Sequence, residues 1–170
     1  MARLSREFYN RDTIEAAKLL LGKYLVRVLD GEMLVCRITE TEAYRGQEDT
    51  ACHAHKGRTK RTEIMYGPAG HAYIYLCYGI HWLMNVVTGD LDSPQAVLIR
   101  ACEGAAGPGK LTKALKITGL ENGCSITGDT DLWIEDDGFS CQVDTKKRVG
   151  IAYASQEDQD RLWRFVMRKP

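Results

Sequence analysis

The residues best suited to chemistry are two carboxylates in the segment Ile38–His55. Apolar residues alternate along a predicted strand as far as Ile38, so Glu40 and Glu42 are expected to continue the same face where its apolar part ends. Burial there would raise the pKa of a carboxyl group and a neighbouring cation would lower it, which is how an active site tunes a general acid or base. The Glu-x-Glu pattern alone also fits an exposed strand end that leads into a solvated loop.

Arg100 is the cation best placed to serve such a site. It shares the parity of Leu98 in the predicted strand Gln95–Cys102, which is otherwise apolar, and an unpaired guanidinium group would be costly to bury there. We therefore expect a carboxylate partner, with Glu42 or Glu40 as the natural candidates. The pattern fits a purely structural ion pair equally well.

Aromatic and basic side chains gather around these residues. A single tyrosine on a strand is typical of half-buried packing. Several rings beside carboxylates, His53 and a basic loop instead favour stacking on a flat ligand, and a nucleobase is the common flat ligand next to phosphate-binding residues. Asn85, which shares the parity of Leu83, needs a polar partner if it is buried. The aromatic residues are Tyr44, Tyr73, Tyr75, Tyr78 and Trp82, and the basic ones are Lys56, Arg58, Lys60 and Arg61.

A metal site is the alternative for the histidines of this segment. Cys52, His53 and His55 are possible ligands, but their spacing is not that of a zinc finger and a second ligand pair is missing. No glycine-rich phosphate loop or serine-nucleophile elbow is present. We expect neither a metal nor a cofactor.

Length and composition indicate one globular domain, residues 1–170. A chain of 170 residues buries enough surface to fold without a disulfide or metal. The six cysteines form no Cys-x-x-Cys pair and are interpreted as free thiols in the core. The polar N-terminus predicts no signal peptide and no apolar run is long enough to span a membrane. We expect a monomer that is located either in the cytoplasm, associated with the bacterial nucleoid, or in the nucleus.

The 23 basic and 23 acidic residues cancel, which by itself argues weakly against a nucleic-acid partner. The basic residues are unevenly placed, however, because one run follows the Ile38–His55 segment and another comprises Lys146, Lys147 and Arg148. A local basic surface on a neutral protein therefore stays possible.

The elements that must position these residues are mostly strands. A helix is predicted to start at Asp12 or Thr13 and to stop at Gly22, and Gly46–Arg61 is expected to be a long functional loop. A capping box is predicted at Ser155, followed by a helical turn or a strand at Arg161–Val166. The other predicted elements are a hairpin of Lys23–Leu29 and Glu32–Thr41 around Asp30-Gly31, a meander of His71–Gly79, His81–Thr88 and Gln95–Cys102, a helix at Lys110–Thr118, a hairpin of Leu132–Ile134 and Phe139–Val143, and a strand at Val149–Ala154.

Five sequence blocks together carry a family resemblance. In order, they are EAYRGQEDTACHAHKGRTKR, MYGPAGHAYIYLCYGIHWLMNVV, AVLIRACEG, GPGKLTKAL and KKRVGIAYA. The chain resembles the 3-methyladenine (alkyladenine) DNA glycosylase family from about Asp12 to Phe165. The resemblance implies a single α+β domain with a curved antiparallel β-sheet and a few flanking helices. It also implies a monofunctional base-excision-repair enzyme, without a metal, that flips alkylated or deaminated purines out of double-stranded DNA and hydrolyses the N-glycosidic bond.

The resemblance also implies roles for individual residues. Glu42 matches the general base and Arg100 the arginine that helps to hold the attacking water. Tyr78 matches the residue that wedges into the minor groove where the base has left. Tyr44, His53 and Tyr75 match residues that enclose the flipped base, Asn85 matches a side chain of the pocket wall, and Arg58, Thr59, Arg61 and Lys110 fall where the family contacts the DNA backbone.

Two features depart from the family pattern. The segment ACEGAAGPG, residues 101–109, is shorter than the basic stretch that the family usually carries, and Thr62 stands where asparagine is frequent. One rival interpretation is a non-catalytic nucleic-acid-binding module of the same fold. The other is a metal-dependent hydrolase built on His53, His55 and the carboxylates.

Overall fold

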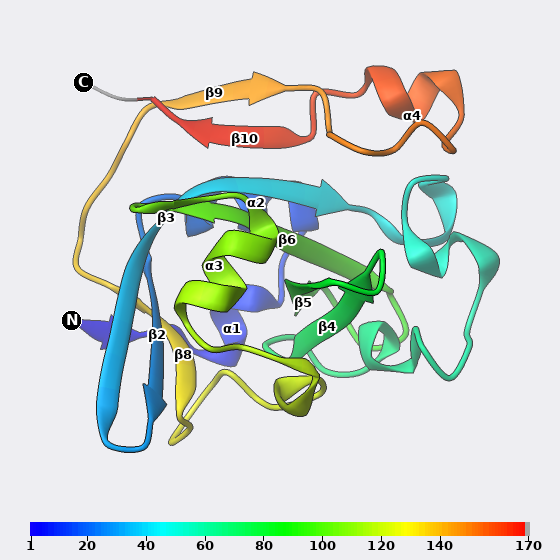
Figure 1. Cartoon of the computed structure of the whole chain (residues 1–170). Coiled ribbons are helices and arrows are strands. Elements are labelled where there is room, and N and C mark those ends of the chain that lie inside the picture. Colours follow the sequence, from blue (N-terminus) through cyan, green and yellow to red (C-terminus); the bar gives the residue numbers. More distant parts are fainter. Residues whose placement is uncertain (169–170) are drawn as a thin grey trace.

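A large open antiparallel sheet organises the chain, and the computed structural model describes residues 1–168. The strands follow the order β1-β8-β2-β3-β6-β5-β4, with β10 paired to β3 and β9, and β7 paired to β6 (Figure 1). The predicted α+β class is confirmed. The strands are β1 (Ala2–Arg3), β2 (Tyr24–Leu29), β3 (Glu32–Tyr44), β4 (Ala72–Cys77), β5 (His81–Thr88), β6 (Gln95–Cys102), β7 (Ala105–Ala106), β8 (Leu132–Asp136), β9 (Val143–Lys146) and β10 (Arg164–Met167).

The helices are short and pack around this sheet. The α-helices are α1 (Arg6–Tyr9), α2 (Thr13–Leu20), α3 (Pro108–Ala114) and α4 (Gln156–Asp160), and short 3-10 turns lie at Gly46–Glu48, His53–Lys56, Glu63–Tyr66 and Gly119–Glu121. The predicted cap of α2 is confirmed, because the Asp12 side chain accepts a hydrogen bond from the Ile14 amide at 2.9 Å. Within residues 1–168, no helix combines the length and apolar character that crossing a membrane requires.

The hairpin of β2 and β3 forms around Asp30-Gly31, as predicted. Both turn residues have positive φ, 53° for Asp30 and 78° for Gly31, and Leu29 pairs with Glu32 across the turn. Strand β3 runs to Tyr44, three residues beyond the predicted end, because its last part pairs with β6 on one side and with β10 on the other. This extension carries Glu42, whereas Glu40 lies within the predicted strand.

An irregularity in β3 reverses the parity of the strand. The pairing with β6 shifts between Ile38 and Thr41, and both of these residues are fully buried, the Thr41 hydroxyl donating to the Ala17 carbonyl of α2 at 2.8 Å. Glu42 therefore points away from the core that Ile38 enters. The prediction that the carboxylates continue the face of Ile38 is wrong, because the ladder with β6 is irregular on both sides of Glu40 and the side chains beyond it emerge on the opposite face.

The meander of β4, β5 and β6 forms as predicted and has two distinct faces. One face joins the main hydrophobic core, through Ile74, Met84 and Ile99 among others. The opposite face presents Tyr73 and Tyr75 of β4, Leu83 and Asn85 of β5, and Leu98 and Arg100 of β6. Because successive side chains of a strand alternate between faces, the meander gathers these polar and aromatic groups on one surface.

The C-terminal third differs from the prediction. β8 pairs with β1 and β2 rather than with Phe139–Val143, and β9 pairs instead with β10 to form a ribbon along β3 (Figure 1). The segment Val149–Ala154 is not a strand, because its groups bond to side chains and turn carbonyls instead of a ladder. The predicted cap at Ser155 is confirmed, since its hydroxyl accepts from the Asp158 amide at 3.2 Å, and Arg164–Met167 is the strand β10.

Candidate active site

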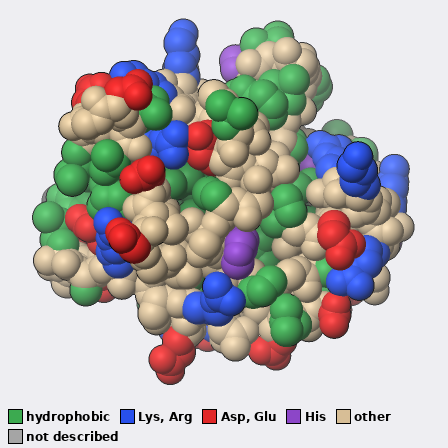
Figure 2. Space-filling model, turned by 90° about the horizontal axis from the view of Figure 1, so that it is seen from below, with side chains coloured by type: hydrophobic (Ala, Val, Ile, Leu, Met, Phe, Trp, Pro, Cys, Tyr) green, Lys and Arg blue, Asp and Glu red, His purple; other side chains and the backbone are tan. Residues whose placement is uncertain are grey.

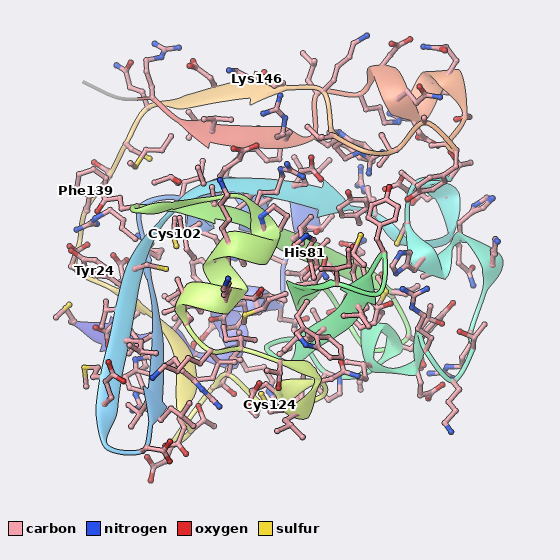
Figure 3. All side chains as sticks on the ribbon, in the orientation of Figure 1. Tyr24, His81, Cys102, Cys124, Phe139 and Lys146 are labelled. Carbon is pink, nitrogen blue, oxygen red and sulfur yellow. The ribbon has the colours of Figure 1, made fainter. Side chains whose placement is uncertain are left out.

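A cavity of about 500 Å³ opens on the polar face of the meander. Its walls come from β3 to β6, the 3-10 turn at His53, the first turn of α3 and the segment at residues 149–153. The first turn of α3 lies against His81, which Figure 3 labels, since a Cβ atom on Gly109 would lie 2.9 Å from the His81 ring. The predicted site residues that line the cavity are Tyr44, His53, Tyr75, Tyr78, Asn85, Arg100 and Lys110.

Glu42 lies immediately behind this wall with 0% of its surface exposed. Its Oε1 accepts from the Val149 amide at 2.8 Å, and its Oε2 accepts from the Tyr44 hydroxyl at 2.7 Å. Burial raises the pKa of Glu42, against the lowering effects of the Arg100 charge and of these hydrogen bonds. A buried carboxylate that is more basic than usual, with a second lone pair on each oxygen, is suited to accept a proton from water.

Arg100 has the carboxylate partners that the sequence predicted. Its Nε donates to Glu40 Oε1 at 3.2 Å, and its Nη1 lies 3.6 Å from Glu42 Oε1. The first contact is a hydrogen bond, whereas the second is only a close approach of opposite charges. Arg100 therefore lies between the two carboxylates, and its Nη1 is not fully committed to Glu42.

Tyr44 is held in place by a buried ion pair that the sequence did not predict. The guanidinium group of Arg148 bonds to both carboxylate oxygens of Asp49, at 2.6 and 2.9 Å. It also lies 5.0 Å from the centre of the Tyr44 ring and 4.9 Å from that of Trp163. Arg148 was interpreted as part of an exposed basic run, and only the preceding Lys146 and Lys147 are exposed.

The aromatic rings of His53, Tyr73 and Tyr75 form another part of the cavity lining. His53 Nδ1 lies 2.8 Å from the Tyr73 hydroxyl, and the His53 ring packs edge-on against Tyr75 with 4.6 Å between the ring centres. Burial, helped by the positive charge of Arg61, lowers the pKa of His53 to about 4. His53 is therefore neutral at physiological pH. The wall offers flat π surfaces and a neutral hydrogen-bonding ring, which suit a planar heterocycle.

Asn85 and Tyr153 complete the lining. The Asn85 amide donates to the Tyr73 backbone carbonyl at 3.2 Å, which supplies the polar partner that its burial requires. Tyr153, which sequence reasoning missed, donates its hydroxyl hydrogen to the Ala51 carbonyl at 2.6 Å. That bond ties the segment after Arg148 to the loop that precedes His53.

Tyr78 stands at the mouth of the cavity on the turn between β4 and β5. It is 89% exposed, and the turn closes through the Ile80 amide and the Cys77 carbonyl at 3.1 Å. Tyr78 and Gly79 both have positive φ, 52° and 67°. Such a conformation is uncommon for a bulky residue and is found where the structure over-determines it, often at functional sites.

The predicted DNA-contact residues are not equally available. Lys110 is exposed at the cavity, and the Arg61 guanidinium group lies 5.2 Å from the centre of the Tyr75 ring. Arg58 instead pairs with Asp92 at 2.8 Å and with Glu63 at 3.2 Å. Thr59 lies in the same loop and does not line the cavity.

The two segments that depart from the family pattern both form tight, hydrogen-bonded turns. The Thr62 hydroxyl accepts from the Thr59 amide at 2.9 Å and donates to the Gly57 carbonyl at 3.1 Å, so it closes the basic turn. The short 101–109 segment forms a tight hairpin, in which Cys102 pairs with Ala105 of β7, and continues directly into α3.

Nothing in the described residues supports the metal interpretation. In residues 1–168 no group of three His, Cys, Asp or Glu side chains could hold a metal ion. His53 is engaged with Tyr73, and His55 Nδ1 instead lies 2.6 Å from the Gln47 carbonyl. The described cysteines are free thiols, of which Cys52 and Cys102 are buried.

Comparison with known proteins adds an independent line of observation. Residues 7–170 match the family described as methylpurine-DNA glycosylase (MPG). The chain is 42% identical to a protein of Natranaerobius thermophilus over 98% of this chain and 96% of that protein, and 43% identical to one of Desulfitobacterium hafniense with the same coverage. It is 43% identical to a protein of Methanocella arvoryzae over 95% of this chain and 90% of that protein. All three are named "Putative 3-methyladenine DNA glycosylase".

Proposed function

This chain belongs to the methylpurine-DNA glycosylase family, and from that premise we propose that it flips a damaged purine out of duplex DNA and hydrolyses its N-glycosidic bond with a water activated by Glu42. The resemblance inferred from the five sequence blocks is confirmed, and with it the assignment as a DNA N-glycosylase. The proposal goes beyond this assignment in three respects: the base leaves the helix before it is cut, the nucleophile is a water activated by Glu42, and the substrates include both alkylated and deaminated purines.

The observation that carries the proposal is the position of Glu42. Its carboxylate is fully buried behind a wall shared by Tyr44, Arg100 and Val149, at a cavity that the rings of His53 and Tyr75 also line. A purine stacked on those rings would bring its glycosidic bond towards the carboxylate. A target base inside a duplex cannot reach such a cavity, so the nucleotide must rotate out of the helix.

The chemistry follows from these groups. The bond between the purine nitrogen and C1′ breaks, its electron pair leaves with the base, and the sugar becomes an oxocarbenium-like cation. Glu42 stabilises that developing charge and takes a proton from the water that attacks C1′. Arg100 holds a donor 3.6 Å from Glu42 Oε1, where it can orient the water.

The leaving base receives no general acid from this constellation. Glu40, the second carboxylate, accepts from the guanidinium groups of Arg100 and Arg164 and does not line the cavity. A purine methylated at N3 or N7 already carries a positive charge and needs no acid, whereas hypoxanthine and etheno-adenine are neutral and would leave as anions that take a proton from solvent water. We therefore propose that both classes are substrates and that cationic purines leave faster.

The test is release of free base from duplexes that each contain one lesion. Duplexes with 3-methyladenine, 7-methylguanine, hypoxanthine or etheno-adenine are incubated with excess enzyme, and the released base is quantified over time. The proposal predicts faster release of the cationic 3-methyladenine and 7-methylguanine and slower release of the neutral hypoxanthine and etheno-adenine. Tight binding to these duplexes without release of any base would favour the non-catalytic binding module.

A further inference from the structure

Glu40 occupies a position that the proposed reaction does not use directly. Its Oε1 accepts from Arg100 Nε at 3.2 Å and from Arg164 Nη1 at 2.9 Å. Arg164 lies on β10 directly opposite Glu42 in the strand register, and its Nε donates to the Lys147 carbonyl at 2.7 Å. The charges of Arg164, Glu40, Arg100 and Glu42 therefore alternate along one continuous chain of contacts.

We propose that Glu40 and Arg164 are positioning residues that hold Arg100 and set how strongly its charge acts on Glu42. The inference rests on the proposed role of Glu42 as the base. It concerns two residues that do not line the cavity and do not touch the reacting atoms.

The geometry supports a positioning role for Glu40 that is distinct from the role of Glu42 as the base. Arg100 gives its Nε hydrogen to Glu40, and its Nη1 stops 3.6 Å from Glu42 Oε1, beyond normal hydrogen-bond length. A complete bidentate pair with Arg100 would stabilise the ionised form of Glu42 and make it a weaker base. By holding Arg100 from the other side, Glu40 leaves Glu42 basic and leaves Nη1 free for a water molecule.

The surroundings of Glu42 contain few other charges that could compensate for a change in this chain. The charged and titratable groups that face Glu42 or Glu40 are Tyr44 of β3, Arg100 of β6, Arg164 of β10, and Arg148 and Tyr153 of the segment that follows β9.

Replacing Glu40 and replacing Arg164 should shift the pH dependence of base release in opposite directions. Glu40→Gln keeps an oxygen for Arg100 but removes a negative charge, so the pKa of Glu42 falls and the acidic limb of the rate profile moves to lower pH. Arg164→Gln removes a positive charge, so that limb moves to higher pH. We expect shifts of about 0.5 to 1 pH unit, below the roughly 1 to 3 units that a directly contacting charge causes.

The experiment is single-turnover base release by the full chain between pH 5 and 9, combined with the carboxyl-carbon NMR titration of Glu42 in the free protein. Thermal unfolding verifies that each variant is folded. Arg164→Lys keeps the charge and should leave the limb unchanged. Arg168→Gln, which removes an exposed pair with Asp144 on the same ribbon, is the matched control and should also leave it unchanged.

Opposite shifts for Glu40→Gln and Arg164→Gln support the positioning role. Shifts in the same direction overturn the positioning role, as does a loss of rate in both variants without any shift. The contacts of Glu40 and Arg164 would then contribute to stability alone. If the wild-type protein releases no base, the proposed function fails, while the NMR titration still decides how Glu40 and Arg164 act on Glu42.

Discussion

At the scale of single residues, the role proposed for Glu42 requires a carboxylate that ionises although it is fully buried. Glu42 is compensated by two hydrogen bonds and by Arg100, yet burial still raises its pKa. The proposed role of Glu42 and the stability of the fold therefore oppose each other at this position, as is common in active sites.

The first prediction concerns the stability of Glu42→Gln. Because the folded pKa of Glu42 lies above the unfolded value of about 4.3, its protonation favours the folded state. That contribution is present below the unfolded pKa and is lost as the pH rises through the folded pKa. The variant should therefore gain stability relative to wild type between pH 4 and pH 8 in urea unfolding. If the stability of the variant relative to wild type instead fell as the pH rose, the raised pKa of Glu42 would be contradicted.

The second prediction concerns Arg100. If Arg100 orients the water, Arg100→Gln should lower the single-turnover rate by roughly 10²-fold or more, the scale for losing one positioned electrostatic group. Unfolding must be measured alongside, because the change leaves Glu40 and Glu42 without their shared partner. Full activity in a destabilised variant would assign Arg100 to a structural ion pair.

At the scale of elements, substitutions in the turn between β4 and β5 can distinguish base flipping from simple binding in the DNA groove. Tyr78 projects from this turn with 89% of its surface exposed, whereas Tyr75 lies within the wall of the cavity. A wedge compensates for the few kcal/mol of stacking that a base loses when it leaves the helix.

The third prediction follows from that contrast. Tyr78→Ala should slow excision from a well-paired duplex much more than from a mismatch or a single strand, where extrusion of the base costs less. Tyr75→Ala should slow all three substrates alike, since the pocket is needed however the base arrives. Single-turnover excision on the three substrates is the measurement. An equal loss on all three for Tyr78→Ala would remove the wedge assignment.

The elements also show how far the sequence could be interpreted. Alternation in the meander assigned Asn85 to the face of Leu83 and Arg100 to the face of Leu98, and all four residues line the cavity, because that periodicity is local. The irregularity before Glu42 was not predictable, since it arises from the pairing of β3 with β6 and leaves no mark in the local sequence. The role of Arg148 was missed because its partner Asp49 is distant in the sequence, and a basic run is normally a solvated face. The pairings of β8 and β9 were wrong for the same reason, since turn signals identify hairpins only between neighbouring strands.

At the scale of the whole molecule, the charge balance is unusual for a DNA enzyme. The chain carries 23 basic and 23 acidic residues, and many basic residues pair with acidic ones, as Arg58 does with Asp92. Figure 2 shows basic and acidic side chains interspersed on the face seen from below. We infer that only a few cations near the mouth of the cavity, Arg61 and Lys110 among them, neutralise phosphates.

The fourth prediction is a shallow salt dependence. With two to four phosphate contacts, the slope of log K against log salt for abasic duplex should be about −2 to −4, since each neutralised phosphate of B-DNA contributes roughly −0.9. Lys110→Gln should reduce the slope by about one. Lys116→Gln is the control, because Lys116 pairs with Glu32 and does not line the cavity. A slope near −8 would require a broad basic surface that this charge distribution does not offer.

The central claim is that Glu42 activates the water, and the most direct measurement is the single-turnover release of 3-methyladenine by Glu42→Gln beside its binding to abasic duplex. The isosteric change keeps an acceptor for the Val149 amide and removes the base. The account predicts that release is abolished while binding stays within a few-fold of wild type. Near-normal release by this variant would contradict the account and would move the catalytic role to Glu40 or to another group.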